Sequence, residues 1–80
     1  AIGLWPSDDL ELGPDPGAER VFYVLRGRVR VGFHKFLGEL EPHEFIMIPA
    51  GVGLSIRNGG PEAALVLAIS ALSRGLEERR

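Results

Sequence analysis

The chain has 80 residues, with nine basic and eleven acidic side chains, a net charge of −2 and no cysteine. This length predicts one domain spanning residues 1–80, near the size at which a single hydrophobic core barely offsets the loss of chain entropy. The lack of cysteine excludes disulfides, thiolate metal sites and thiol catalysis, so pairing with a second copy of the chain is the expected supplement. The charge balance argues against a strongly basic surface for nucleic acid or anionic membranes.

The longest nearly apolar segment, Ala63 to Leu72, is about half as long as a membrane-spanning helix requires, so it is expected to be a core strand. The first residues do not combine a basic segment with an apolar stretch, which is the pattern of a secretory signal, so cytoplasm is the default location. Arginine outnumbers lysine eight to one, which is typical of a heat-adapted or GC-rich source.

Turn-forming residues recur every few positions and separate short apolar segments, which indicates an all-β fold. The first clear strand is Val21 to Leu25, which is β-branched and aromatic and stops at Gly27. Because this segment is apolar at every position, both of its faces need cover. The segment from Arg28 to Phe33 alternates between basic and apolar residues, so one of its faces should be core and the other solvated.

Four more strands are expected, separated by turns rich in proline, glycine and asparagine. In chain order they cover 36–40, 45–48, 54–57 and 64–70. The strand at 45–48 is wholly apolar and is expected to be buried, and it ends at Pro49, which has no N–H for a sheet ladder. The charged tail, 71–80, is expected to form a frayed helical turn or to be disordered.

Two segments resemble the two sequence motifs of the cupin family. Val21-Phe22-Tyr23-Val24-Leu25-Arg26-Gly27 is similar to the end of the first motif. Ile48-Pro49-Ala50-Gly51, followed by Asn58 at the family's spacing, is similar to the second. The resemblance covers approximately residues 10–70, and it implies a small cupin-like jelly-roll β-barrel of antiparallel strands.

The positions at which cupins hold their metal carry other residues in this chain. Counting back from Gly27 places the two histidine positions of the first motif at Pro14 and Pro16, and its glutamate position at Arg20. The histidine position of the second motif is Leu54. Proline and leucine have no donor side chain and a guanidinium stays protonated. The sequence therefore predicts a barrel without a metal site or another cofactor.

Arg20 is the candidate anchor for a ligand inside the barrel. In the cupin register its side chain points into the barrel mouth, where a guanidinium could clamp a carboxylate, phosphate or sulfate in an apolar pocket. The competing interpretation is an internal ion pair with Asp15 or Glu19, or solvation at the rim. The expected ligand-binding residues of the interior are Arg20, Phe22, Val24, Leu54, Ile56 and Asn58.

The other polar side chains favour structural roles. His34 and His43, the two histidines, lie in predicted turns and are expected at the surface. A basic stripe is suggested by the alternate positions of Arg26, Arg28 and Arg30, but no exposed aromatic residues lie between them for base stacking. A solvated strand face is therefore the preferred interpretation, and neither nucleic acid nor membrane is an expected partner.

Trp5 and Tyr23 are large side chains that a monomeric barrel leaves unexplained, and they favour a homodimer seam. The leading hypothesis is a metal-free, dimeric cupin-type binding or accessory domain with no catalytic residue, whose barrel takes a small anionic or sugar-like molecule. One alternative is a metal-independent isomerase or lyase that uses Arg20, Tyr23 or Glu19. The other is a structural or regulatory dimerisation domain without a small ligand.

Overall fold

The computed structural model describes residues 1–72, which form eight strands and contain no helix. The strands are β1 (Ile2–Leu4), β2 (Asp9–Leu12), β3 (Ala18–Arg26), β4 (Val29–Phe33), β5 (Phe36–Leu40), β6 (Phe45–Ile48), β7 (Leu54–Arg57) and β8 (Ala64–Leu72). The predicted bounds of β5, β6 and β7 are confirmed. Residues 1–72 contain no helix that is long and apolar enough to cross a membrane.

Two of the eight strands, β1 and β2, were absent from the six predicted ones. β1 is three residues long and contains a glycine, and half of β2 is acidic, so neither carries a strong local strand signal. The prediction for the end of the chain was also wrong in part, because β8 continues through Ala71 to Leu72. The rest of the predicted tail lies outside the described residues.

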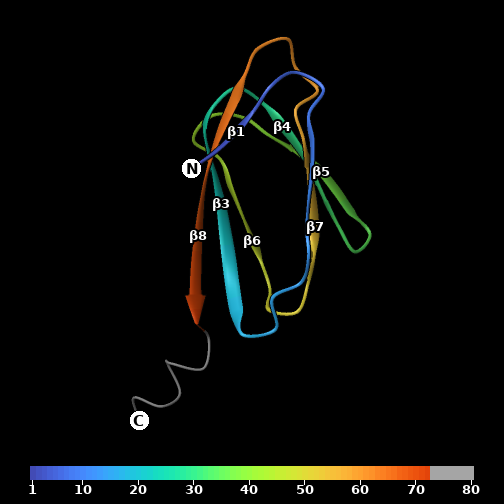
Figure 1. The fold of residues 1–80 in the computed structure, drawn as a ribbon, viewed down its shortest axis with the longest axis vertical. Helices are drawn as coiled ribbons and strands as arrows, with labels where there is room; N and C mark the ends of the chain where they lie inside the picture. The colour runs from blue at the N-terminus through green and yellow to red at the C-terminus, as the bar shows by residue number, and fades with distance from the viewer. Residues whose placement is uncertain (73–80) are drawn as a thin grey trace.

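The strands form two four-stranded sheets in which every pairing is antiparallel. The first sheet has the order β1-β8-β3-β6, and the second has the order β2-β7-β4-β5. Figure 1 shows β8, β3 and β6 side by side on one side of the molecule, with β7 and β5 on the other. Consecutive strands repeatedly change sheet, as expected for a jelly roll.

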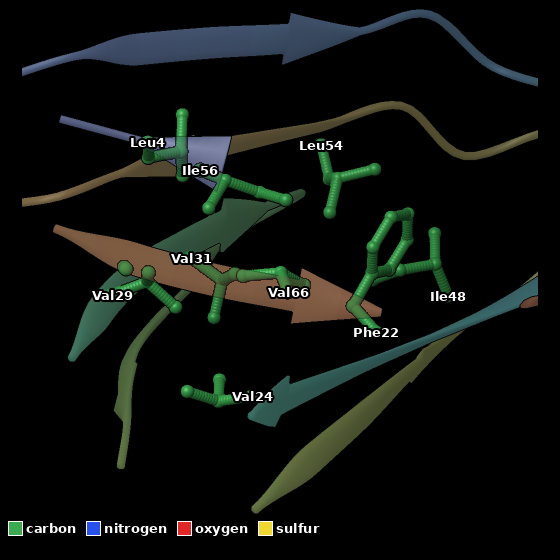
Figure 2. Packing of buried hydrophobic residues seen from close by; sticks show 10 residues of the cluster. Leu4, Phe22, Val24, Val29, Val31, Ile48, Leu54, Ile56 and Val66 are labelled. Atoms are coloured by element: carbon green, nitrogen blue, oxygen red, sulfur yellow. The ribbon is translucent and has the colours of Figure 1, made fainter. Parts of the chain in front are cut away.

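Alternate residues of both sheets point inward and form the core. Figure 2 shows side chains from the two sheets meeting between the strands. Their exposed fractions are 5% or less, which indicates a packed interior. The core residues are Leu4, Phe22, Val24, Val29, Val31, Ile48, Leu54, Ile56, Ala64 and Val66.

The prediction that β6 is buried on both faces was wrong. Ile48 is fully buried, but Phe45 and Met47 are 60% and 54% exposed. β6 lies at the edge of the first sheet, and no other part of residues 1–72 covers the outer face of that sheet at these two positions. An apolar sequence alone does not distinguish a strand buried on both faces from one whose outer face lacks a partner.

The three arginines that suggested a basic stripe are divided between two sheets. Arg26 ends β3 in the first sheet, whereas Arg30 lies in β4 in the second and Arg28 precedes it. The guanidinium groups of Arg28 and Arg30 lie 4.0 and 3.7 Å from the carboxylate of Glu39. The predicted solvated face flanked by acid is therefore confirmed for these two residues.

Gly27 separates the two sheets at the point where β3 ends. Its φ is +80°, a conformation that L side chains rarely adopt. A Cβ atom at this position would lie 2.8 Å from both the carbonyl oxygen of Ala63 and the Cα of Ala64. Only glycine therefore fits here, which explains physically why the motif ends with this residue.

Candidate functional site

Arg20 lies on the inner face of β3, in the same alternating set as the buried residues Ala18 and Phe22. Its Nη2 donates a hydrogen bond to the carbonyl oxygen of Val52 at 2.7 Å. Val52 belongs to the connection between β6 and β7. The arginine side chain therefore reaches from the first sheet to the loop that leads into the second, as the inward orientation in the predicted register requires.

The guanidinium of Arg20 is incompletely satisfied. Its Nε is the one buried side-chain nitrogen or oxygen in residues 1–72 without a hydrogen-bond partner. The predicted ion pair with Asp15 or Glu19 is not formed: the ion pairs among the described residues join Arg28 and Arg30 to Glu39, and Arg57 to Asp9. Within residues 1–72 this half-buried cation has no counterion, which is unfavourable, and an anion from solution would offset that cost.

The cross-strand neighbours of Arg20 are Ile48 on β6 and Ser70 on β8. Side chains at directly opposite positions lie on the same face of a sheet with Cβ atoms about 5 Å apart. Ile48 is fully buried, whereas Ser70 is exposed. Solvent therefore reaches the inner face of the first sheet on the β8 side of Arg20, where Ser70 is the cross-strand neighbour of the arginine.

Four of the predicted ligand-binding residues, Phe22, Val24, Leu54 and Ile56, are part of the packed core (Figure 2). The structure brings them together between the sheets, with exposed fractions of 0–5%. A ligand in contact with all four would have to displace core side chains or occupy space that opens when the sheets move. Leu54 also lines a surface hollow of about 470 Å³ together with Leu12 and Phe33.

Asn58, the sixth predicted residue, is fully buried, and its side chain makes three hydrogen bonds within the protein. Its Nδ2 donates to the carbonyl oxygens of Leu4 and Glu62 at 3.0 and 2.8 Å, and its Oδ1 accepts the N–H of Gly60 at 3.0 Å. Both amide hydrogens are therefore engaged. In this structure Asn58 joins the first strand to the connection between β7 and β8.

The positions that correspond to metal ligands in cupins do not assemble a donor set. Pro14 and Pro16 lie in the connection between β2 and β3 and are exposed, while Leu54 is buried. Residues 1–72 contain no group of three or more histidine, aspartate or glutamate side chains that could hold a metal ion. The two histidines lie in exposed turns, as predicted, with φ values of 52° and 73°.

Tyr23 and His43 form a pair that sequence reasoning missed. The Tyr23 hydroxyl and the His43 Nδ1 are 3.0 Å apart, which is a hydrogen bond whose donor depends on the histidine tautomer. Tyr23 and Glu19 lie on the outer face of β3, opposite to Arg20, because successive strand residues alternate. The three residues considered for metal-independent catalysis therefore do not converge on one point.

The outer face of the first sheet carries two rows of apolar side chains across β6, β3 and β8. One row is Met47, Val21 and Ile69, and the other is Phe45, Tyr23 and Leu67. Phe45, Met47 and Ile69 are all more than half exposed. We call these six residues the apolar face. Scattered exposed apolar residues are ordinary, but a contiguous group is typical of an interaction surface.

No protein-family model matches the sequence, and neither does any curated protein. Solved structures do match. The protein TT1209 of Thermus thermophilus is 28% identical with a TM-score of 0.81 over 88% of this chain and 67% of that one. The Cnp3 cupin domain of Schizosaccharomyces pombe is 20% identical, with a TM-score of 0.84 over 98% of this chain and 57% of that one.

A predicted oxalate decarboxylase of Thermotoga maritima is 21% identical to the chain, with a TM-score of 0.82 over 88% of this chain and 61% of that one. The chain thus spans between 57% and 67% of the length of these three proteins. At identities near 20%, similarity of this kind concerns the backbone fold. It does not transfer an activity.

Proposed function

Since the chain has a cupin-like jelly-roll fold, we propose that it is a non-catalytic, metal-free binding or accessory domain that works as a homodimer. The observation that carries the proposal is the apolar face on β6, β3 and β8. The predicted oxalate decarboxylase among the matched structures represents the catalytic alternative.

A second copy of the chain is the partner that suits this surface best. The six side chains form a 3 × 2 grid on neighbouring strands, which is regular enough to pack against the same grid related by a two-fold axis. Burial of each large apolar side chain contributes about 1.5–3 kcal/mol relative to exposure. The self-complementary surface would supply stability that a small core lacks.

Substitution of the apolar face tests the homodimer. Phe45→Asp and Met47→Asp place charges on side chains that are already exposed, so the barrel should still fold. Wild type is expected to sediment as a dimer at micromolar concentration and both variants as monomers. The matched control is Leu37→Asp, because Leu37 is 85% exposed but lies on the second sheet. A monomeric wild type, or a dimer that persists in both face variants, would contradict the proposal.

A second candidate function is the binding of a small anionic or sugar-like molecule in the barrel, with Arg20, Phe22, Val24, Leu54, Ile56 and Asn58 as the interior residues. The unpartnered Nε of Arg20 and the exposure of its cross-strand neighbour Ser70 favour this candidate. The ligand would approach from the β8 side, since Phe22 and Ile48 fill the core next to Arg20.

Thermal-shift measurements with small carboxylates, phosphate and sugars test this candidate. A ligand that binds only the folded chain raises the unfolding temperature by mass action, so a hundredfold excess over Kd contributes about 2.7 kcal/mol. The shift is expected in wild type and should vanish in Arg20→Gln. Elemental analysis of the same samples tests whether the domain is free of metal. A stoichiometric amount of bound transition metal would refute the metal-free part of the proposal.

A further inference from the structure

The outer face of the second sheet carries a row of four charged side chains with the two cations in the middle. The register places Asp9 opposite Arg57, Arg57 opposite Arg30, and Arg30 opposite Glu39. Two arginines are thus direct cross-strand neighbours on β7 and β4. Like charges at such positions destabilise a sheet unless a counter-charge lies nearby.

Each arginine forms a long ion pair with the acid on the strand that lies away from the other arginine. Arg57 Nη1 lies 3.8 Å from Asp9 Oδ2, and Arg30 Nε lies 3.7 Å from Glu39 Oε2. These distances exceed the range of a charge-assisted hydrogen bond, and exposed pairs of this kind contribute little to stability. Neither guanidinium is therefore fully hydrogen-bonded by its acid.

The row next to these charges has small residues in the middle. Ser55 on β7 and Gly32 on β4 are cross-strand neighbours, and Leu37 on β5 lies opposite Gly32. A Cβ atom on Gly32 would lie 3.0 Å from Leu37 Cδ2 and 3.1 Å from Ser55 Oγ, so the missing side chain lets Leu37 lean over the sheet. Beside these residues lies a hollow of about 580 Å³, whose lining includes Gly32, Ser55, Leu37, the two arginines and, at its ends, the two acids Asp9 and Glu39.

We propose that this hollow is a binding site for a small molecule that joins one anionic group, a carboxylate or a phosphate, to a flat apolar body. The anion would lie between Arg30 and Arg57 and accept N–H donors from both guanidinium groups. The apolar body would lie against the exposed side chain of Leu37, which itself leans over Gly32, with the Ser55 hydroxyl at its edge. This site is separate from the apolar face and from Arg20, because it lies on the outside of the other sheet.

The charge pattern favours a single anionic group over a polyanion. Arg30 and Arg57 are flanked on both sides by Asp9 and Glu39, which would repel a second negative charge extending in either direction along the row. The size of the hollow lies within the range of small-molecule sites. The arrangement thus selects a compact ligand with one charged end.

Binding is tested by two-dimensional NMR at fixed ionic strength, with phenyl phosphate and benzoate as probes and inorganic phosphate and benzyl alcohol as partial ligands. The expected result is saturable shifts at the amides of Gly32 and Ser55 with phenyl phosphate or benzoate, and affinity at least tenfold weaker for the partial ligands. Arg30→Gln and Arg57→Gln should each weaken binding by about tenfold or more, since each removes a charge-assisted pair.

Three further variants make the result decisive. Arg28→Gln removes a guanidinium that also lies near Glu39 but is not part of this hollow, so binding should stay within about twofold of wild type. Ser55→Leu fills the floor and should abolish binding of phenyl phosphate. Arg20→Gln separates this hollow from the barrel interior, because the shifts at Gly32 and Ser55 should persist in that variant. Equal affinity for inorganic phosphate, absence of saturation, or loss of binding in Arg20→Gln alone would each overturn the proposal. The last outcome would assign the anion to the barrel interior.

Discussion

At the scale of single residues, the structure distinguishes polar side chains whose hydrogen bonds are all made within the protein from those with an unbonded group. Asn58 and Arg20 were both predicted to line the barrel. The Asn58 side chain is fully buried and makes three hydrogen bonds to backbone groups. The Arg20 side chain makes one such bond and leaves its Nε without a partner. The first arrangement has the marks of a structural residue, and the second those of an available binding group.

Asn58→Ala is expected to lower the free energy of unfolding by about 3 kcal/mol. The substitution leaves buried partners of the amide without hydrogen bonds, and each such group costs about 1–3 kcal/mol, although the costs do not add fully. Urea denaturation measures the change. Ser55→Ala is the control, because its Oγ makes one long bond of 3.5 Å and its loss should cost about 0.5 kcal/mol or less. Equal stability of Asn58→Ala and wild type would refute the structural role.

At the scale of the element, the hairpin of β4 and β5 shows how a turn can carry strain. Phe33 and Phe36 are paired, so His34 and Lys35 form a two-residue loop. His34 has a φ of 52°, which is unusual for a residue with a Cβ and which tight hairpins commonly assign to glycine or asparagine. The ring of Phe36 also packs over Gly38, where an added Cβ would meet the ring.

His34→Gly is expected to raise the free energy of unfolding by about 0.5 kcal/mol. Glycine removes the steric cost of a positive φ, which is about 1–2 kcal/mol for an L residue, but it also loses more chain entropy on folding. Thermal and urea unfolding check the sign. Lys35→Gly is the matched control, since Lys35 does not have a positive φ, and it should destabilise the hairpin. Destabilisation by His34→Gly would show that the histidine side chain itself contributes.

At the scale of the whole molecule, the two sheets differ in what covers their outer faces. Apart from Leu37, the second sheet presents charged and small residues, such as Arg57, Arg30 and Ser55, which suit water. The first presents the apolar face, including Phe45 and Met47. In a barrel of this size, an apolar outer surface on one sheet makes self-association the natural route to a larger buried area.

The unfolding temperature of wild type is therefore expected to depend on protein concentration. If unfolding and dissociation are coupled, each tenfold rise in concentration should raise it by about 4 °C for a chain of this length. Differential scanning calorimetry over a hundredfold range measures the slope. Phe45→Asp should show a slope of zero, and a flat response in wild type would contradict coupled dimerisation.

The sequence by itself determined the local elements, because turn residues and side-chain alternation are encoded between near neighbours. Pro49 and Gly27 marked the ends of β6 and β3, and the alternation of 28–33 placed Val29 and Val31 in the core. The similarity of two short segments to cupin motifs was enough to predict the jelly-roll fold that the structural matches confirm.

Tertiary structure alone decided which faces are covered and which polar groups are free, because these depend on pairings between distant segments. The apolar run of β6 did not reveal that Phe45 and Met47 would face outward at a sheet edge. Nor did parity along the chain reveal that Arg30 would lie beside Arg57, 27 positions away, since strand order is set by packing of the whole barrel. The apolar face and the hollow on the second sheet both arise from such long-range neighbours.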